Sequence, residues 1–176
     1  KGDVAAGFEK VKTVFEENFK KRGELGACCC VYYKGKKVVD LWGGIRNYKT
    51  GELWEEDTVS IVFSTTKGVS SMAVAHAHSK GLFDYDDKVS KYWSEFAENG
   101  KEDITIRQVL SHQAGLSAID EPLALEKLGD PDALAYAIGK QKPSWKAGQK
   151  QGYHGISLGW YESEIIRRTD PKKRTI

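Results

Sequence analysis

The feature that most constrains the fold is a single pair of strand-like runs near the start of the chain. The segment ACCCVYYKGKKVVDLWGG, residues 27–44, places two apolar runs on either side of Lys34 and Gly35, a pattern typical of a β-hairpin. Two antiparallel strands alone form a marginal sheet, because both edges are unpaired and one hairpin buries little apolar surface. We therefore expect the hairpin to be covered by helices of this chain or extended by strands from elsewhere.

Helical patterns precede and follow the hairpin. The segment FEKVKTVFEENFKKRG, residues 8–23, repeats apolar residues at helical spacing and stops at Gly23, which predicts an amphipathic helix at the start of the chain. From about residue 65 onward the patterns are mostly helical, in the segments TKGVSSMAVAHAHSKG, TIRQVLSH, DPDALAYAIGK and ISLGWYESEIIRR. Residues 1–60 are thus expected to hold the first helix and strands, and residues 61–176 to form a mainly helical region.

Two of these helical segments carry start signals. Thr105 and Gln108 have the spacing of a capping box, in which each side chain bonds the backbone N–H of the other residue. Asp130 followed by Pro131 is a typical helix opening, because proline is tolerated at the first helical position. Helices are therefore predicted to begin at about residues 105 and 130.

Composition limits the classes of function. The 176 residues are 40% hydrophobic and 30% charged, which is typical of a globular chain long enough for one domain with a substantial core. The 27 basic and 25 acidic residues give a net charge of +2 and are spread along the chain, apart from a short basic run at residues 172–174. We therefore expect no nucleic-acid binding. No apolar run approaches the ~20 residues of a membrane-spanning helix, so we expect no membrane span.

The three cysteines, Cys28, Cys29 and Cys30, are consecutive and lie inside the first strand-like run. Neighbouring strand residues point to opposite faces, so adjacent cysteines are poorly placed to form a disulfide or to chelate one metal ion. We expect them to be small buried hydrophobic residues in a protein of the cytoplasm or another reducing compartment.

The segment FSTTKG, residues 63–68, allows two interpretations of Ser64. Serine is a favoured helix cap, and a lysine in the first turns of a helix is usually a solvated surface charge. Alternatively, Ser64 is a nucleophile and Lys67, one helical turn away, is its base. The free N–H groups at a helix N-terminus would stabilise the anion that forms when an acyl group is attacked. These residues alone leave the choice open.

The wider sequence favours the second interpretation. Three blocks follow one another: VFSTTKGVSSMAVAHAHSKGLFDYDDKVSKYWSEF, ITIRQVLSHQAGL and SWKAGQKQGYHGISLGWYESEIIRR. In order and spacing they resemble the serine β-lactamase-like family, and within it the branch of class C β-lactamases, D-Ala-D-Ala carboxypeptidases and family VIII esterases, with its eukaryotic β-lactamase-like relatives. The resemblance runs from about residue 8 to residue 170. It implies that Ser64 is the acylated serine, Lys67 the SxxK lysine and Tyr153 the tyrosine of the family's Tyr-x-Asn motif.

The implied role of Tyr153 is chemically reasonable. A phenol with a pKa near 10 becomes a proton shuttle if a cation such as Lys67 stabilises its anion, so the two side chains would act as one coupled unit. The alternative is a tyrosine that anchors the loop before the last helix. The family pattern favours the catalytic role.

The sequence departs from the family pattern in two places. His154 and Gly155 follow Tyr153, so the asparagine side chain of the Tyr-x-Asn motif is absent, which weakens the expectation of β-lactamase activity. The family's third motif, Lys-Thr-Gly or His-x-Gly on a late strand, should follow the tyrosine by more than a hundred residues, and this sequence ends at Ile176. The Lys-Thr-Gly at residues 49–51 precedes Ser64 in a polar stretch, and we interpret it as a turn.

The resemblance implies an α/β (α+β) fold of the β-lactamase/transpeptidase type: an antiparallel sheet flanked by helices plus a helical domain, with the sheet incomplete in this chain. The expected partner is the C-terminal half of the same domain, from a second chain or from further sequence. The expected function is a serine hydrolase that forms an acyl-enzyme with a small ester or amide substrate and prefers activated esters to β-lactams. A non-catalytic binding or assembly module is the alternative.

No metal ion and no cofactor are expected. His76 and His78 are two residues apart on a predicted helix and so point to different sides, unlike helical metal ligands at i and i+4. His112, in the segment LSHQAGL, matches a structural block of the family. We expect it to bind the backbone near Gly115 and not to take part in the chemistry.

Overall fold

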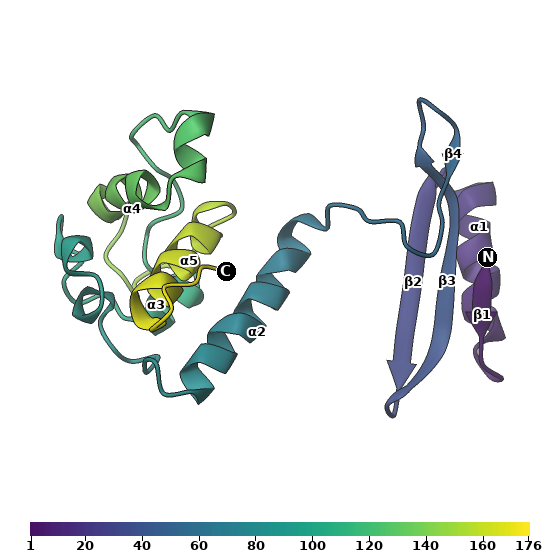
Figure 1. Cartoon of the computed structure of the whole chain (residues 1–176), viewed down its shortest axis with the longest axis horizontal. Helices are drawn as coiled ribbons and strands as arrows, with labels where there is room; N and C mark the ends of the chain where they lie inside the picture. The colour runs from purple at the N-terminus through teal and green to yellow at the C-terminus, as the bar shows by residue number, and fades with distance from the viewer. The chain divides into compact units, whose positions relative to one another are not determined.

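The computed structural model describes residues 1–176, apart from the side chain of Leu125. The chain divides into two compact units, Lys1–Ile61 and Val62–Ile176 (Figure 1). Among the described residues, no helix is both long and apolar enough to cross a membrane.

The first unit is a small antiparallel sheet with one helix. Its elements are β1 (Gly2–Val4), α1 (Glu9–Lys21), β2 (Gly26–Tyr33), β3 (Lys36–Asn47) and β4 (Glu52–Leu53). The strand order is β1-β3-β2, and β4 pairs with the far end of β3. The predicted hairpin is confirmed as β2 and β3. Strand β1 was not predicted, so the expectation that a helix opens the chain is wrong.

Turn chemistry explains the hairpin. Lys34 and Gly35 both have positive φ, 47° and 75°, as a two-residue turn that matches the twist of the flanking strands requires. Cys29 then pairs with Leu41 and Val31 with Val39. Strand β1 adds Val4 opposite Val39 on the other side of β3. Within the described part of the chain, the outer edge of β2 has no strand beside it.

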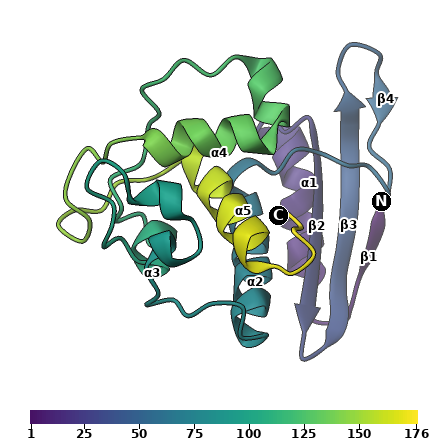
Figure 2. The same cartoon turned by 60° about the vertical axis from the view of Figure 1, so that its left-hand side comes forward.

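Helix α1 covers one face of this sheet (Figures 1 and 2). The predicted apolar stripe supplies Phe8, Val11 and Phe15, which pack against the buried Val39 and Leu41 of β3. None of the residues of α1 is itself buried, because the helix has one apolar side and lies on a narrow sheet. The unit therefore has a thin core.

The expectation for the cysteines is partly wrong. Cys28 and Cys30 are exposed, Cys29 is partly buried, and all three are free thiols. Cys29 points toward α1 and packs in the core of the unit. Its two neighbours alternate to the opposite face of the sheet, which the described residues of this unit leave open.

The second unit is helical. Its elements are η1 (Phe63–Thr65), α2 (Thr66–Ser79), η2 (Val89–Lys91), η3 (Ser94–Ala97), α3 (Ile106–Leu110), η4 (Leu125–Gly129), α4 (Pro131–Lys140) and α5 (Ser157–Thr169). Helix α5 packs against α2, α3 and α4 (Figure 2). The interior between them contains large side chains with almost no exposure: Trp93, Phe96, Ile106, Leu116 and Tyr161.

The start signals read from the sequence are confirmed. Thr105 accepts a hydrogen bond from the N–H of Gln108, and the Gln108 side chain accepts one from the N–H of Thr105. Asp130 accepts hydrogen bonds from Asp132 and Ala133 at the start of α4, with Pro131 at the first helical position. Both caps satisfy backbone donors that a helix end leaves unpaired.

Candidate active site

Ser64 lies in the short η1 turn that leads directly into α2. The residue before it, Phe63, has φ 45°, in the left-handed region that a bulky side chain rarely adopts. Such strain is concentrated at functional sites, where the surrounding structure holds it in place. Neither η1 nor α2 has a side-chain cap, so Ser64 does not serve as the helix cap that its residue type allows.

Two side chains meet the Ser64 hydroxyl. Lys67, one turn further along, places its Nζ 3.4 Å from Ser64 Oγ. Tyr153, 89 residues away in the sequence, donates a hydrogen bond of 2.6 Å from its hydroxyl to the same oxygen. The Lys67 ammonium lies 5.0 Å from the centre of the Tyr153 ring. The structure therefore brings together all three residues that the resemblance singles out.

The backbone after Tyr153 fixes the lysine. Lys67 Nζ donates a hydrogen bond of 2.5 Å to the carbonyl oxygen of Gly155. No side-chain pattern reveals this contact in the sequence, because the acceptor is a main-chain group. It joins α2 to the segment that enters α5 and keeps the amine beside Ser64.

The surroundings of Tyr153 favour its anion. Hydrogen bonding with Ser64 and with Lys67, and the charge of Lys67, lower the pKa of the phenol below its ordinary value. Tyr153 is 61% exposed, so water screens this effect. The direction is the one that a tyrosine acting as a proton acceptor needs.

Two histidines form hydrogen bonds with the backbone in and around the segment that carries Tyr153. His112 Nδ1 accepts a hydrogen bond of 3.0 Å from the N–H of His154, and His154 Nε2 accepts one of 2.8 Å from the N–H of Leu116. His154 Nδ1 is in turn bonded to the carbonyl of Gly152. Burial lowers the pKa of both imidazoles, and for His112 the neighbouring His154 and Lys67 lower it further. Each ring accepts a backbone N–H, which only a neutral imidazole does.

This arrangement corrects one expectation. His112 does bind backbone, but at His154 and not near Gly115. The histidine that binds the chain beside Gly115 is His154, through the N–H of Leu116. His112 itself has φ 61°, and its ring lies 5.1 Å from that of Tyr153. His154 is fully buried, although nothing about its position in the sequence, between a tyrosine and a glycine, predicts this.

Gly155 stands where the family has asparagine. It does not have a positive φ, and a Cβ added to it would meet the Tyr153 ring at 3.5 Å, an ordinary contact. Backbone geometry therefore does not require glycine here. What the chain lacks at this point is a side-chain amide beside Ser64.

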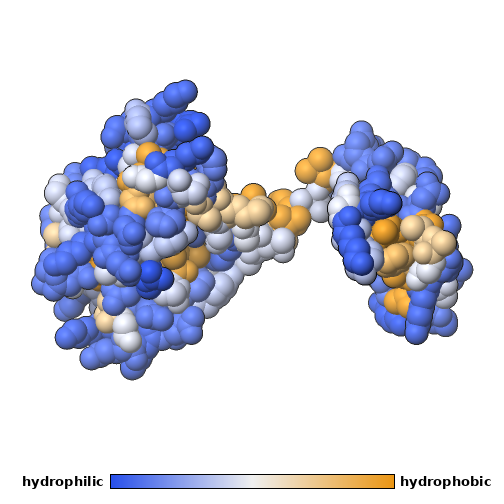
Figure 3. Space-filling model, turned by 90° about the horizontal axis from the view of Figure 1, so that it is seen from below, coloured by the Kyte–Doolittle hydropathy of each residue, from blue (hydrophilic) through white to orange (hydrophobic). Residues whose placement is uncertain are grey.

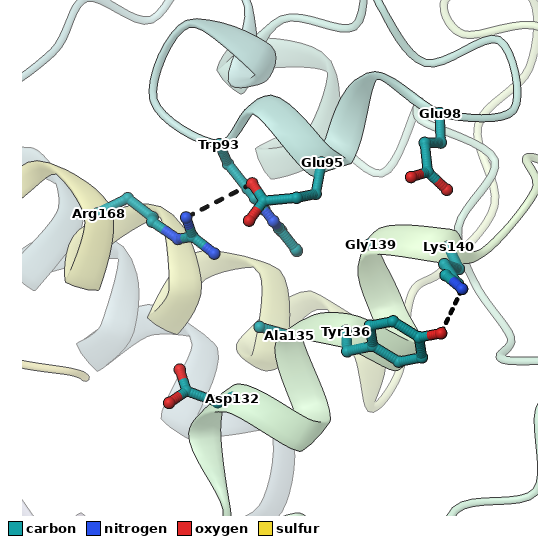
Figure 4. A pocket seen from close by; sticks show the side chains of 9 residues that line it. All are labelled: Trp93, Glu95, Glu98, Asp132, Ala135, Tyr136, Gly139, Lys140 and Arg168. Carbon is teal, nitrogen blue, oxygen red and sulfur yellow. Dashed lines mark hydrogen bonds and ion pairs between the residues drawn. The ribbon is translucent and has the colours of Figure 1, made fainter.

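A separate cavity lies elsewhere in the second unit (Figure 4). It has a volume of about 250 Å³ and lies between η3, α4 and the end of α5. Several of its charged groups are already paired, since Arg168 lies 3.5 Å from Glu95, Asp132 lies 2.9 Å from Arg167, and Lys140 donates to Tyr136. It contains none of Ser64, Lys67 and Tyr153. Among the described residues, no group of three or more His, Cys, Asp or Glu side chains is placed to hold a metal ion.

Comparison with known proteins shows the family and the fold of the chain. Residues 11–175 match the family model described as Beta-lactamase. The chain is 33% identical over 165 residues to the esterase/beta-lactamase LipL of Mycobacterium tuberculosis, which covers 94% of this chain and 38% of LipL.

Two solved structures superpose closely on the chain. One is a family VIII carboxylesterase, with a TM-score of 0.94 and 37% identity, covering 99% of this chain and 47% of that protein. The other is a penicillin-binding protein homologue from Caulobacter crescentus, with a TM-score of 0.90 and 38% identity, covering 98% and 46%. The chain thus has the β-lactamase/transpeptidase-like fold and spans less than half the length of these relatives. It belongs to the beta-lactamase family.

Proposed function

We propose that this chain carries the nucleophile of a serine hydrolase that forms an acyl-enzyme at Ser64. The observation that supports this most strongly is the convergence of Tyr153 and Lys67 on Ser64 Oγ, at 2.6 and 3.4 Å. Relatives named as esterases and β-lactamases support the same class of reaction. A serine hydroxyl needs such a base, because it is a weak nucleophile while it keeps its proton.

The proposed proton transfers use the contacts among Ser64, Lys67 and Tyr153. In the reactive state the Tyr153–Lys67 pair has lost one proton relative to its fully protonated form. The phenolic oxygen then accepts the Ser64 proton as Oγ bonds to the acyl carbon. The same proton then passes to the leaving alcohol or amine as its bond to the acyl carbon breaks. A water molecule then hydrolyses the acyl-enzyme in the same way. It gives a proton to the Tyr153–Lys67 pair as its oxygen bonds to the acyl carbon. Ser64 Oγ then leaves the acyl carbon and takes the proton back from the pair.

The complete site needs more chain than residues 1–176. The outer edge of β2 is unpaired among the described residues, and an unpaired edge is a template for further strands. At the start of α2, Val62, Phe63, Val69 and Met72 are 54%, 80%, 59% and 65% exposed, and Figure 3 shows apolar surface there. We infer that a C-terminal half supplies further strands, covers this surface, and adds a second N–H to that of Ser64 in the oxyanion hole.

Covalent labelling tests the proposal. A fluorophosphonate should modify Ser64 in the longest natural polypeptide that contains residues 1–176, as located by peptide mass spectrometry. Ser64→Ala should abolish the label, whereas Ser79→Ala, at the other exposed end of α2, should leave it intact. Absence of labelling in the folded full-length protein would favour the alternative, a non-catalytic binding or assembly module.

The substrate is proposed to be a small activated ester and not a β-lactam. Gly155 offers no amide to bind the amide of a penicillin or cephalosporin, and a polar group left unpaired in a site costs about 1 to 3 kcal/mol. The test compares kcat/KM for p-nitrophenyl butyrate and nitrocefin. Gly155→Asn, which the backbone geometry admits, should raise turnover of nitrocefin relative to the ester. A higher value for nitrocefin in the unmodified protein would contradict the ester preference.

A further inference from the structure

Glu162 is a buried carboxyl group for which the proposed reaction has no role. It lies on α5 with 1% of its surface exposed. Its Oε2 is 2.7 Å from the hydroxyl of Ser70 on α2, and its Oε1 has no hydrogen-bond partner. Ser70 also lies one turn beyond Lys67 and donates to the Lys67 carbonyl at 3.0 Å. The Glu162 carboxyl group is therefore linked through Ser70 to the backbone of Lys67, whose side chain contacts Ser64.

A second glutamate on the same helix shows how this protein pairs a buried carboxylate. Glu164 is 4% exposed, and it accepts hydrogen bonds from Arg167 at 2.7 and 2.9 Å and from Arg168 at 2.6 Å. Such charge-assisted pairs satisfy both oxygens and offset the charge. Glu162 has no arginine or lysine within bonding distance among the described residues. A lone negative charge there would be buried, half-satisfied and costly.

The contacts of Ser70 indicate which form is present. A serine hydroxyl has one hydrogen to donate, yet Ser70 Oγ lies within bonding distance of two acceptors, the Lys67 carbonyl at 3.0 Å and Glu162 Oε2 at 2.7 Å. Both contacts are hydrogen bonds only if Glu162 Oε2 carries a proton and donates to Ser70, while Ser70 donates to Lys67. Burial raises the pKa of the Glu162 carboxyl, which agrees with this assignment.

We propose that Glu162 is a neutral carboxylic acid at neutral pH and a positioning residue for the Ser64 site. It joins α5 to α2 through Ser70 without placing a negative charge beside Lys67. This second role rests on the proposed hydrolase function. A negative charge on Glu162 would compete with the Tyr153 anion for the Lys67 cation, and the phenol would then be a poorer acceptor of the Ser64 proton.

The charges around Glu162 are few. From α2, the charged group that acts on Glu162 is Lys67, whose attraction opposes the effect of burial. The charged groups on the other elements packed against α5 form ion pairs with residues other than Glu162: Arg107 of α3 with Asp86, and Asp132 of α4 with Arg167. Tyr136 and Lys140 of α4 bond to each other. Ionisation of Glu162 therefore depends chiefly on its burial, on its contact with Ser70 and on the charge of Lys67.

Infrared spectroscopy tests the charge state without any need for activity. In the full-length protein at about neutral pH, Glu162→Gln should remove a band of a protonated carboxyl group. Glu164→Gln is the matched control and should leave that band unchanged, because Glu164 pairs with two arginines. A spectrum in which Glu162→Gln removes only carboxylate absorption would overturn the proposal.

The pH dependence of stability gives a second readout. A carboxyl group whose folded pKa is raised stabilises the protein fully below its ordinary pKa of about 4.3, and this contribution is lost as pH rises through the raised value. The unfolding free energy of the wild type relative to Glu162→Gln should therefore fall as pH rises from about 4.3 to the raised pKa of Glu162. A difference that stays flat or rises over this range would contradict the neutral assignment.

The positioning role is tested by the rate of fluorophosphonate labelling at Ser64. Glutamine keeps a donor for Ser70, so Glu162→Gln should label at about the wild-type rate and with the same pH profile up to neutral pH. Glu162→Ala removes the link and should label roughly tenfold more slowly or worse. Equal rates for alanine and glutamine would refute the positioning role. If no variant labels, the hydrolase proposal fails, and the infrared result still decides the charge of Glu162.

Discussion

The two units of the chain differ in how far each is complete by itself. Among the described residues, the core of the second unit contains 17 buried apolar residues, whereas that of the first contains Val38, Val39 and Leu41. The second unit also holds Ser64, Lys67 and Tyr153, while the first supplies strands and one covering helix. The difference teaches that the proposed nucleophile and proton acceptor are built on the well-packed part, and that the sheet is the part that the proposed C-terminal half would extend.

The largest expected effect tests whether the chemistry belongs to the second unit. Tyr153→Phe removes the hydroxyl that meets Ser64 at 2.6 Å and should slow labelling and ester hydrolysis by roughly 10²–10⁴-fold, the usual contribution of a general acid–base group. The measurement is the rate of fluorophosphonate labelling and kcat/KM for p-nitrophenyl butyrate in the full-length protein.

Tyr136→Phe is the matched control, since Tyr136 is also on the second unit and is 60% exposed, against 61% for Tyr153. It should retain the wild-type rate. A Tyr153→Phe variant as active as the control would show that the Ser64–Tyr153 contact has no role in proton transfer. The two units would then differ in packing, and the proposed assignment of the chemistry to the second unit would lose its support.

The next effect concerns packing. Leu116 and Leu41 are 0% and 2% exposed, one in the core of each unit. Leucine-to-alanine changes in cores cost about 2 to 5 kcal/mol, and the cost is higher where the neighbours cannot collapse into the cavity. We expect Leu116→Ala to lie near the top of that range and Leu41→Ala near the bottom, because the thin core beside α1 is free to relax.

Hydrogen exchange followed by mass spectrometry separates the two units in this test. Leu116→Ala should reduce protection throughout residues 62–176, and Leu41→Ala should reduce it mainly in β2, β3 and α1. If Leu41→Ala proved the more destabilising change, the first unit would be the better packed of the two, and the ranking of the two cores would be reversed.

The elements that sequence reasoning found are those specified by local chemistry. The hairpin follows from Lys34 and Gly35, whose positive φ suits the turn, and two helix starts follow from Thr105 and Asp130. These signals lie within four residues of the structure they determine. Strand β1 was missed because its three residues have no period of their own, and β3 sets their pairing.

The candidate site was less accessible to such reasoning. Lys67 is one turn from Ser64, so the sequence alone places them together, but Tyr153 is 89 residues away and was identified through family resemblance. The Gly155 carbonyl and the burial of Glu162 arise from the packing of α5 on α2, for which the sequence has no local pattern. Long-range contacts of this kind depend on the whole fold.

The smallest expected effect is a difference in pH response between the units. All four histidines lie in residues 62–176. Burial lowers the pKa of His112 and His154 below the ordinary value of about 6.5, so the unfolded state binds more protons than the folded state as pH falls through this range. Stability of the second unit should therefore decline below about pH 6.5, while the first unit, which contains no histidine, should respond less.

Hydrogen exchange at about pH 7 and about pH 5.5, corrected for intrinsic rates, measures this difference. Protection should fall first around Tyr153 and Leu116, because protonation of His154 removes its acceptor for the Leu116 N–H and protonation of His112 removes its acceptor for the His154 N–H. His154→Gln, whose amide oxygen still accepts from Leu116, should flatten the response, whereas a change at the exposed His76 to Gln should not. An equal loss of protection in β2 and β3 would mean that the two units respond to acid together, and the histidine pair would then not be the cause.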